Sequence, residues 1–200
     1  MEWRENKGNF SKSAAFIGSN MRYAKIKNYD VANGPGVRVS IFVSGCNHHC
    51  KGCFNKEAWD FNYGQEFTED TINEILEAMR PNYISGLTLL GGEPFEPINQ
   101  KGLLKLVRKV KKEYPEKDIW AYSGYLFDKD IMERQVKQLK ETKELLSYID
   151  VLVDGKFIEN LKNPNLYFRG SSNQRIIDVK ESLEYDKISE IKFEKEKLVC

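Results

Sequence analysis

Three of the four cysteines in this chain lie in one short stretch, spaced as Cys46-x3-Cys50-x2-Cys53. The stretch begins just after residues 37–43, an apolar run that predicts a buried strand. Zinc ions and iron–sulfur clusters take thiolate ligands, and a cysteine cluster of this kind is typical of a reducing compartment rather than of a disulfide framework. The sequence therefore predicts a metal centre at the end of a strand, around which the fold must be arranged.

The cysteine motif supplies three ligands, and on the residues alone two kinds of site remain open. A structural zinc site needs four ligands, and His48 or His49 could complete it in a zinc-stabilised binding module. Both histidines lie in the gap between the first two cysteines, where a side chain would have to fold back onto a metal already held on both sides. A [4Fe–4S] cluster held by three cysteines would instead keep one iron open for a substrate.

Composition limits the partners and the number of domains. The 200 residues include 31 basic and 30 acidic ones, giving a net charge of +1 without the basic patch that a nucleic-acid partner needs. No apolar run reaches the length of a membrane span or a secretory signal. We expect a cytoplasmic protein that binds neither nucleic acid nor membrane. Its core domain would span residues 21–182, between a flexible extension, residues 1–20, and a C-terminal tail, residues 183–200.

Strands alternate with helices along the core. Beyond the strand at 37–43, apolar runs predict an edge strand at 21–26 and later strands at 87–90, 118–122, 149–153 and 175–179. Helical spacing of apolar residues predicts one helix from Thr68 to just before Pro81, one around 103–110 and one at about 128–146. This order indicates an α/β fold with a mainly parallel sheet, in which the loops at the carboxyl ends of the strands gather at one edge.

A second motif brings a family resemblance. Gly91-Gly92-Glu93-Pro94 follows the strand after the cysteine loop, and an aromatic residue, Phe54, directly follows the third cysteine. Together these motifs resemble the radical S-adenosylmethionine superfamily. The resemblance implies a small partial (β/α) barrel, S-adenosyl-L-methionine bound at an open iron, and a [4Fe–4S] cluster held by Cys46, Cys50 and Cys53.

The same resemblance implies roles for the loops at the strand ends. Gly91 and Gly92 lack side chains, so backbone carbonyls could approach an ammonium closely, and Glu93 would place acceptor charge at the same amino group. Phe54 would pack against adenine. Asp154 would line the cofactor or partner groove, with an ordinary Asp-Gly turn as the alternative. The expected cofactor-binding residues are Gly52, Cys53, Phe54, Gly91, Gly92, Glu93, Ser123 and Asp154.

Further segments resemble one family within the superfamily, the activating proteins of anaerobic (class III) ribonucleotide reductases. These segments are 33–38, 42–46, 117–120, 123–125, 151–157 and 169–175. The resemblance implies reductive cleavage of S-adenosylmethionine and removal of a hydrogen from a glycine of the large reductase subunit, which forms a glycyl radical. It also implies an electron donor such as flavodoxin or ferredoxin, and no catalytic acid or base among the side chains.

Other functions remain open beside this one. The chain could activate another glycyl-radical enzyme such as pyruvate formate-lyase, act on a small molecule as other superfamily members do, or be the zinc-stabilised module. Arg169 and Asn173 would contact the partner or the cofactor carboxylate, or simply close the barrel. Cys200 is expected to be a free thiol, because a fourth protein ligand would occupy the iron that catalysis needs open.

Overall fold

The computed structural model describes residues 21–193. Within them, eight strands form one sheet in the order β3-β1-β2-β4-β5-β6-β7-β8. The parallel centre consists of β2 (Val37–Val43), β4 (Ile84–Gly91), β5 (Asp118–Tyr122) and β6 (Val151–Asp154). The antiparallel flanks are β1 (Arg22–Asp30) with β3 (Gln65–Glu66), and β7 (Arg175–Asp178) with β8 (Ser189–Glu190). The predicted α/β fold is confirmed, but the sheet is parallel only at its centre and antiparallel on both flanks.

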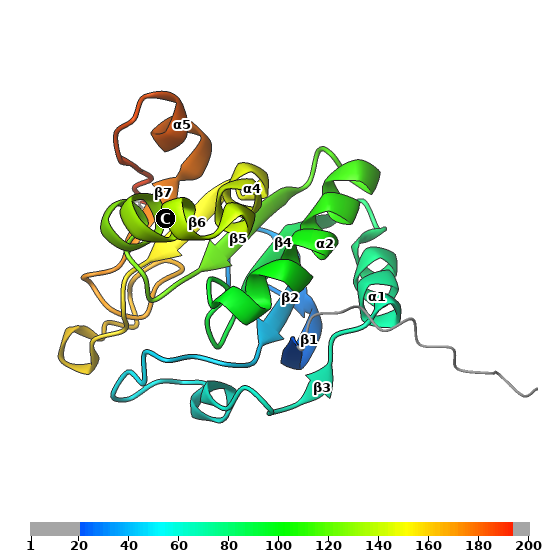
Figure 1. Cartoon of the computed structure of the whole chain (residues 1–200), viewed down its shortest axis with the longest axis horizontal. Coiled ribbons are helices and arrows are strands. Elements are labelled where there is room, and N and C mark those ends of the chain that lie inside the picture. Colours follow the sequence, from blue (N-terminus) through cyan, green and yellow to red (C-terminus); the bar gives the residue numbers. More distant parts are fainter. Residues whose placement is uncertain (1–20, 194–200) are drawn as a thin grey trace, which may run out of the picture.

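Helices pack against this sheet, and Figure 1 shows α1, α2 and α4 side by side along one face. The α-helices are α1 (Glu69–Met79), α2 (Pro97–Glu113), α3 (Val136–Gln138), α4 (Lys140–Tyr148) and α5 (Val179–Glu184). The remaining helical segments are the 3-10 turns η1 (Lys56–Trp59) and η3 (Glu159–Leu161) and the wider π-helical segment η2 (Phe127–Gln135). None of the helices in the described part of the chain is long and apolar enough to cross a membrane.

Local sequence explains most of these elements. Six of the seven residues of β2 are buried, as expected for a central parallel strand covered on both faces. Helix α1 begins after Thr68, whose hydroxyl accepts a hydrogen bond from the Thr71 amide while the Thr71 hydroxyl accepts one from the Thr68 amide. This reciprocal cap satisfies two backbone donors that the first helical turn leaves unpaired. The predicted start of the helix at Thr68 is therefore confirmed.

The helix predicted at about 128–146 is interrupted. Residues 127–135 form the π-helical η2, and Leu139 leaves the helical conformation at φ −127° and ψ 112° before α4 begins. No glycine or proline occurs between 128 and 146, so the interruption has no local signal. It lies where buried Gln100 of α2 contacts both sides of the break, accepting a hydrogen bond from Thr142 (2.7 Å) and donating one to Gln135 (3.4 Å). Tertiary contacts decide this segment.

The ends of the sheet differ from the expectation. The predicted edge strand at 21–26 is longer, and β1 pairs on both sides because β3 lies outside it. The predicted boundary at 182 falls inside α5, and β8 pairs with β7 beyond it. The predicted extension at 1–20, the last seven residues of the tail and Cys200 lie outside the described residues.

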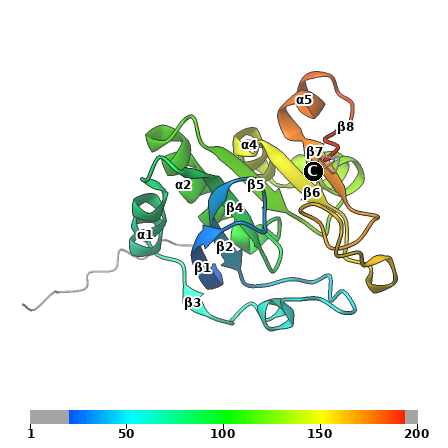
Figure 2. The same cartoon turned by 180° about the vertical axis from the view of Figure 1, so that it is seen from behind.

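The connections that leave the central strands reach one side of the molecule. In Figure 1 the cyan connection between β2 and β3 and the yellow and orange connection between β6 and β7 both extend below the sheet. Figure 2, from behind, shows the two connections on the same lower side. The predicted gathering of strand-end loops at one edge is confirmed, since residues of both connections line a common pocket.

Candidate metal and cofactor site

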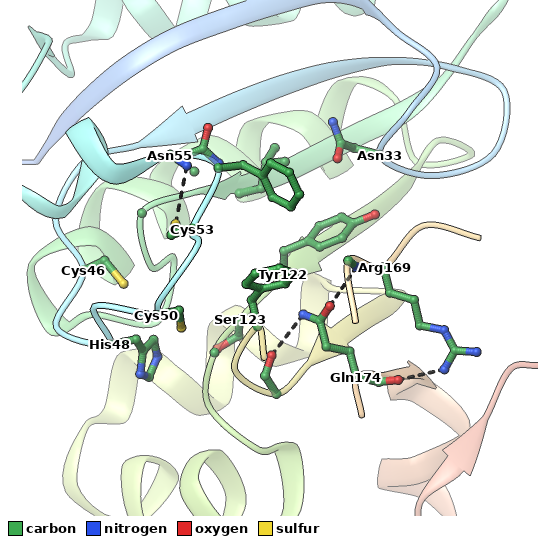
Figure 3. A pocket seen from close by; sticks show the side chains of 18 of the residues that line it. Asn33, Cys46, His48, Cys50, Cys53, Asn55, Tyr122, Ser123, Arg169 and Gln174 are labelled. Carbon is green, nitrogen blue, oxygen red and sulfur yellow. Dashed lines mark hydrogen bonds between the residues drawn. The ribbon is translucent and has the colours of Figure 1, made fainter. Parts of the chain in front are cut away.

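A pocket of about 350 Å³ lies at this edge of the sheet. Its walls come from the loops that follow β1, β2, β4 and β5, and from the connection between β6 and β7. Figure 3 shows the three cysteines on one side of the pocket, Tyr122, Arg169 and Gln174 on the other, and Ser123 between them. Of the expected site residues, those that line the pocket are Cys46, Cys50, Cys53, Phe54, Gly91, Gly92 and Ser123.

Backbone hydrogen bonds hold the cysteine loop against its neighbours. The Cys46 amide donates to the carbonyl of Trp59 (3.2 Å), and the Cys53 amide donates to the carbonyl of Cys50 (3.1 Å), which turns the chain tightly between these two residues. The Gly45 carbonyl accepts the amide of Glu93 (2.9 Å) and so joins the loop to the one after β4. These hydrogen bonds hold the cysteine loop against the neighbouring loops, so it does not project freely from the fold.

Burial keeps the thiols of Cys46 and Cys50 protonated in the absence of a metal. Cys46 is 7% exposed, and burial raises the pKa of its thiol to about 12, although the backbone N–H of His48 acts in the opposite direction. Burial also raises the pKa of Cys50, whose side chain is half-buried. A thiol becomes a good ligand only as the thiolate, and a bound metal supplies the positive charge that removes the proton. The site therefore fits a thiolate-bound metal group and is poorly suited to a reactive free thiolate.

The two histidines are placed differently from one another. His48 has a nearly buried side chain, and its Nε2 donates to Glu93 Oε2 at 2.9 Å. His49 is exposed, and its ring packs edge-on against Trp59 at a centroid distance of 4.8 Å. Within residues 21–193 no three His, Cys, Asp or Glu side chains come together as ligands of a metal ion. Because Nε2 of His48 is engaged by Glu93, a Cys3His zinc site would have to use Nδ1 of this ring.

Close backbone contacts explain why two glycines, Gly91 and Gly92, occur where β4 ends. Gly91 has a φ of +109°, and a Cβ there would lie 2.7 Å from backbone atoms of Phe42. A Cβ on Gly92 would lie 2.6 Å from the carbonyl oxygen of Gly45 and 2.8 Å from that of Ala58. Any side chain at either position would push β4 away from the strand or loop beside it. These glycines bring the β4 loop against the cysteine loop.

Glu93 is fully buried and its carboxylate is saturated by protein donors. Oε1 accepts the amide of Phe95 (2.8 Å) and the hydroxyl of Ser123 (2.9 Å), and Oε2 accepts the amide of Gly124 (2.8 Å) and His48 Nε2 (2.9 Å). An ionised carboxylate offers about four acceptor sites. The geometry therefore differs from the expectation that Glu93 presents free acceptor charge to a cofactor, because all four sites are already occupied.

Asp154 also serves the framework. It is fully buried, and its carboxylate accepts the amide of Phe127 (2.7 Å) and pairs with Arg175 through both oxygens. The pKa of Arg175 is raised by its hydrogen bonds to Asp154 and Asp128, which keeps the guanidinium charged. Gly155 lines the pocket, whereas the Asp154 side chain points into this ion pair. The structure brings Ser123 to the pocket and keeps the Asp154 carboxylate away from it.

Phe54 stands at the pocket as an exposed aromatic ring. It is 66% exposed, lies 5.4 Å from the ring of Phe157 and has the ammonium of Lys162 4.9 Å above it. An ordinary core residue would be buried, so Phe54 is not part of the core. Gly52, in the same turn, has a φ of +73° and sits beside the Glu159 carboxylate.

The connection before β7 closes the far side of the pocket. Arg169 lines it, and its Nη1 donates to the carbonyl of Gln174 (2.7 Å), whereas Asn173 bonds to the carbonyl of Lys156 (2.9 Å) and does not line the pocket. Tyr122, which was not among the predicted site residues, lines the pocket with a buried hydroxyl that has no hydrogen-bond partner among the described residues. Burial raises the pKa of that hydroxyl, so it stays a neutral O–H group. Its only sequence signal was its place at the carboxyl end of a strand.

Comparison with known proteins adds independent findings. Residues 32–177 match a family model described as a 4Fe-4S single cluster domain. Relatives named anaerobic ribonucleoside-triphosphate reductase-activating protein occur in Enterobacteria phage T4 (45% identical over 156 residues) and Haemophilus influenzae (43% over 158 residues). The alignments cover 78% of this chain in both cases, and 93% and 97% of the two relatives. The relative of the same name in Escherichia coli K12 is 43% identical over 156 residues, covering 77% of this chain and 96% of the relative.

Proposed function

The chain belongs to the family of anaerobic ribonucleoside-triphosphate reductase-activating proteins, and on this premise we propose that it activates a class III ribonucleotide reductase by forming a glycyl radical on the reductase's large subunit. The observation that carries this function is that three buried or half-buried cysteines and the Gly91-Gly92 turn line the same pocket. A pocket of about 350 Å³ leaves room for a small molecule beside the thiols.

We assign the cluster to Cys46, Cys50 and Cys53. When bound there, a [4Fe–4S] cluster with S-adenosyl-L-methionine supplies the one-electron chemistry that yields a hydrogen-abstracting radical. The three soft sulfur ligands suit iron–sulfur chemistry, and three ligands leave one iron of the cube open. Within residues 21–193 neither histidine is grouped with two of the cysteines as a ligand set, and His49 is exposed.

The chain's own groups would bind and orient S-adenosylmethionine. We propose that the backbone of Gly91 and Gly92 faces the amino group of S-adenosylmethionine, and that Phe54 packs on adenine beside the backbone of Gly52. Exposure of the Phe54 ring supports this, because stacking would remove apolar surface from water. Ser123 would support the same wall. We also propose that the sheet and its helices act as a partial barrel that is open toward the partner protein.

The pocket is open to solvent on one side. An open pocket suits a protein substrate better than an enclosed pocket would. The reductase glycine must reach the pocket as part of a chain, and the rim residues Phe54 and Phe157 offer aromatic surface beside it. The electron would come from a small donor protein such as flavodoxin or ferredoxin. The cytoplasm is the compartment that we propose, because it keeps such thiols reduced.

The decisive experiment follows the radical from cofactor to partner. After anaerobic reconstitution, iron and sulfide analysis should give one [4Fe–4S] cluster per chain, and addition of reductant and S-adenosylmethionine should release methionine and 5′-deoxyadenosine. Incubation with the anaerobic reductase of the same organism should then give the doublet of a glycyl radical by electron paramagnetic resonance. Tightly held zinc without iron would refute the proposal, as would cluster formation without a radical on the reductase.

Two cysteine variants provide the matched control. Cys50→Ala should abolish both the cluster and cleavage of S-adenosylmethionine, because two thiolates hold the cube too weakly. Cys200→Ala should leave both unchanged. Loss of the cluster in Cys200→Ala would show that the three-ligand assignment is wrong.

A further inference from the structure

The Glu93 carboxylate joins three loops that meet at the pocket. Its four hydrogen-bond donors are His48 from the cysteine loop, Ser123 and Gly124 from the loop after β5, and Phe95 from its own loop. Each distance lies between 2.8 and 2.9 Å, and the carboxylate is completely buried. Hydrogen bonds to an ionised group are stronger than those between neutral groups, and in a buried setting their loss is costly.

The bond to His48 reaches the cysteine loop next to a thiol. The His48 ring is clamped between this bond and the ring of Tyr125, at a centroid distance of 4.4 Å. Its position is further restricted by Gly124, where a Cβ would lie 2.3 Å from the imidazole ring. The backbone N–H of the same residue acts to lower the pKa of the Cys46 thiol, against the larger effect of burial, so it lies near that sulfur. Fixing the ring therefore fixes the backbone beside the thiol of Cys46, and His48 lies on the pocket wall near Cys50 (Figure 3).

We propose that Glu93 and His48 form a positioning pair that holds the cysteine loop in its cluster-binding shape, and that the Glu93 carboxylate does not itself bind the amino group of S-adenosylmethionine. This inference rests on the function proposed above. An ammonium could reach the carboxylate only by displacing one of its four donors, and each displaced donor would be left buried and unpaired. Partners that orient metal ligands in this way typically contribute roughly tenfold to a hundredfold to metal retention.

The test compares the rate at which the reconstituted protein loses iron to a ferrous chelator under anaerobic conditions. Glu93→Gln turns an amide NH₂ toward two of the four donors, and His48→Phe keeps a ring against Tyr125 but removes the N–H donor. Each should lose iron about tenfold faster than the unchanged protein. The double variant should be no faster than the faster single one, because both changes break the same connection.

Two further variants act as controls. His48→Gln places an amide N–H where Nε2 lies and should keep the loss rate within about twofold of the unchanged protein. His49→Asn alters the exposed neighbour at a position with a φ of +47°, which asparagine tolerates, and should also have little effect. If His48 acts by positioning, the rate of iron loss should follow the hydrogen bond, which His48→Gln keeps, and not the ring volume, which His48→Phe keeps.

The reduction potential of the cluster gives a readout that general destabilisation would not produce. N–H groups directed at cluster sulfurs stabilise the more negative reduced state, so they raise the potential. His48→Phe should therefore shift the potential to a more negative value in a titration followed by electron paramagnetic resonance, and His48→Gln should restore it. If Glu93→Gln does not fold, the three single His48 and His49 variants still decide the question.

The outcomes separate this inference from the proposed function. Unchanged iron retention and potential in His48→Phe, with weakened S-adenosylmethionine binding in Glu93→Gln alone, would overturn the positioning pair and leave the activase function intact. An unchanged protein that assembles no [4Fe–4S] cluster would instead overturn the proposed function. Faster iron loss in both Glu93→Gln and His48→Phe, with no further increase in the double variant, supports the positioning pair.

Discussion

Alanine at Gly91 should be the most damaging of three glycine substitutions around the pocket. Gly91 combines a φ of +109° with a hypothetical Cβ 2.7 Å from the backbone of Phe42. The backbone strain costs about 1–3 kcal/mol and the overpacking about 1–3 kcal/mol, which together lower the free energy of unfolding by about 2–6 kcal/mol. Since whole domains are stable by only about 5–15 kcal/mol, this loss is large.

Gly92 and Gly155 separate the two contributions. Gly92 has no positive φ, but a Cβ there would lie 2.6 Å from the Gly45 carbonyl oxygen. Gly92→Ala therefore tests the close contact alone and should lower the free energy of unfolding by about 1–3 kcal/mol. Gly155 has a φ of +97°, but its nearest neighbour would be 3.7 Å away, so alanine there tests backbone strain alone. The lower entropy of the unfolded alanine chain offsets about 0.4–1 kcal/mol of that strain.

The assay is urea unfolding of the cluster-free protein under reducing, anaerobic conditions, with the free energy of unfolding obtained by linear extrapolation. Iron retention after reconstitution is measured in parallel. Gly92→Ala should also weaken retention, because it displaces the Gly45 carbonyl of the cysteine loop, whereas Gly155→Ala should retain the cluster. A Gly91→Ala protein as stable as Gly155→Ala, within about 0.5 kcal/mol, would refute the reasoning.

Three further substitutions test the framework and the pocket wall. Burial raises the pKa of Asp150, but hydrogen bonds from Lys180, the Ile119 amide and Lys111 outweigh it, so the pKa is lowered on balance. The resulting stabilisation is present above the unfolded pKa of about 3.9 and is lost as the pH falls through the lower folded value. Asp150→Asn should therefore lower the free energy of unfolding by about 1–3 kcal/mol at pH 7, with the difference from the unchanged protein shrinking in acid; a constant difference would contradict this. Asp154→Asn removes one of the two carboxylates that pair with Arg175 and leaves Asp128 as the other, so it should lower the free energy of unfolding by about 1–3 kcal/mol. S-adenosylmethionine binding measured by calorimetry should stay the same, and a selective loss of binding would place Asp154 in the cofactor site. Tyr122→Phe removes a buried hydroxyl that has no partner among the described residues, so the cluster-free protein should be as stable or more stable in urea, and a loss above about 1 kcal/mol would show that the hydroxyl is paired.

Local patterns in the chain determined the elements and the chemistry of the loops. The apolar run of β2 predicted its bounds, 37–43, because a strand buried on both faces needs such a run. The cap residue Thr68 marked the start of α1. Cysteine spacing, with the Gly-Gly turn after the next strand, pointed to a metal centre at the sheet edge, because parallel strands deliver their loops to the same side.

Tertiary structure alone decided what the polar side chains of that edge do. From the sequence, Glu93 and Asp154 are expected to bind the cofactor, with an Asp-Gly turn as the alternative for Asp154. A carboxylate after a strand gives the same sequence pattern whether it faces a pocket or the protein interior. Apart from the Phe95 amide, the hydrogen-bond donors to these two carboxylates come from residues 21 to 45 positions away along the chain, including His48, Ser123 and Arg175. The break before α4 and the pairing of β8 likewise depend on distant contacts. Spacing along a chain predicts which loops meet, but hydrogen-bond saturation depends on three-dimensional neighbours that no local pattern encodes.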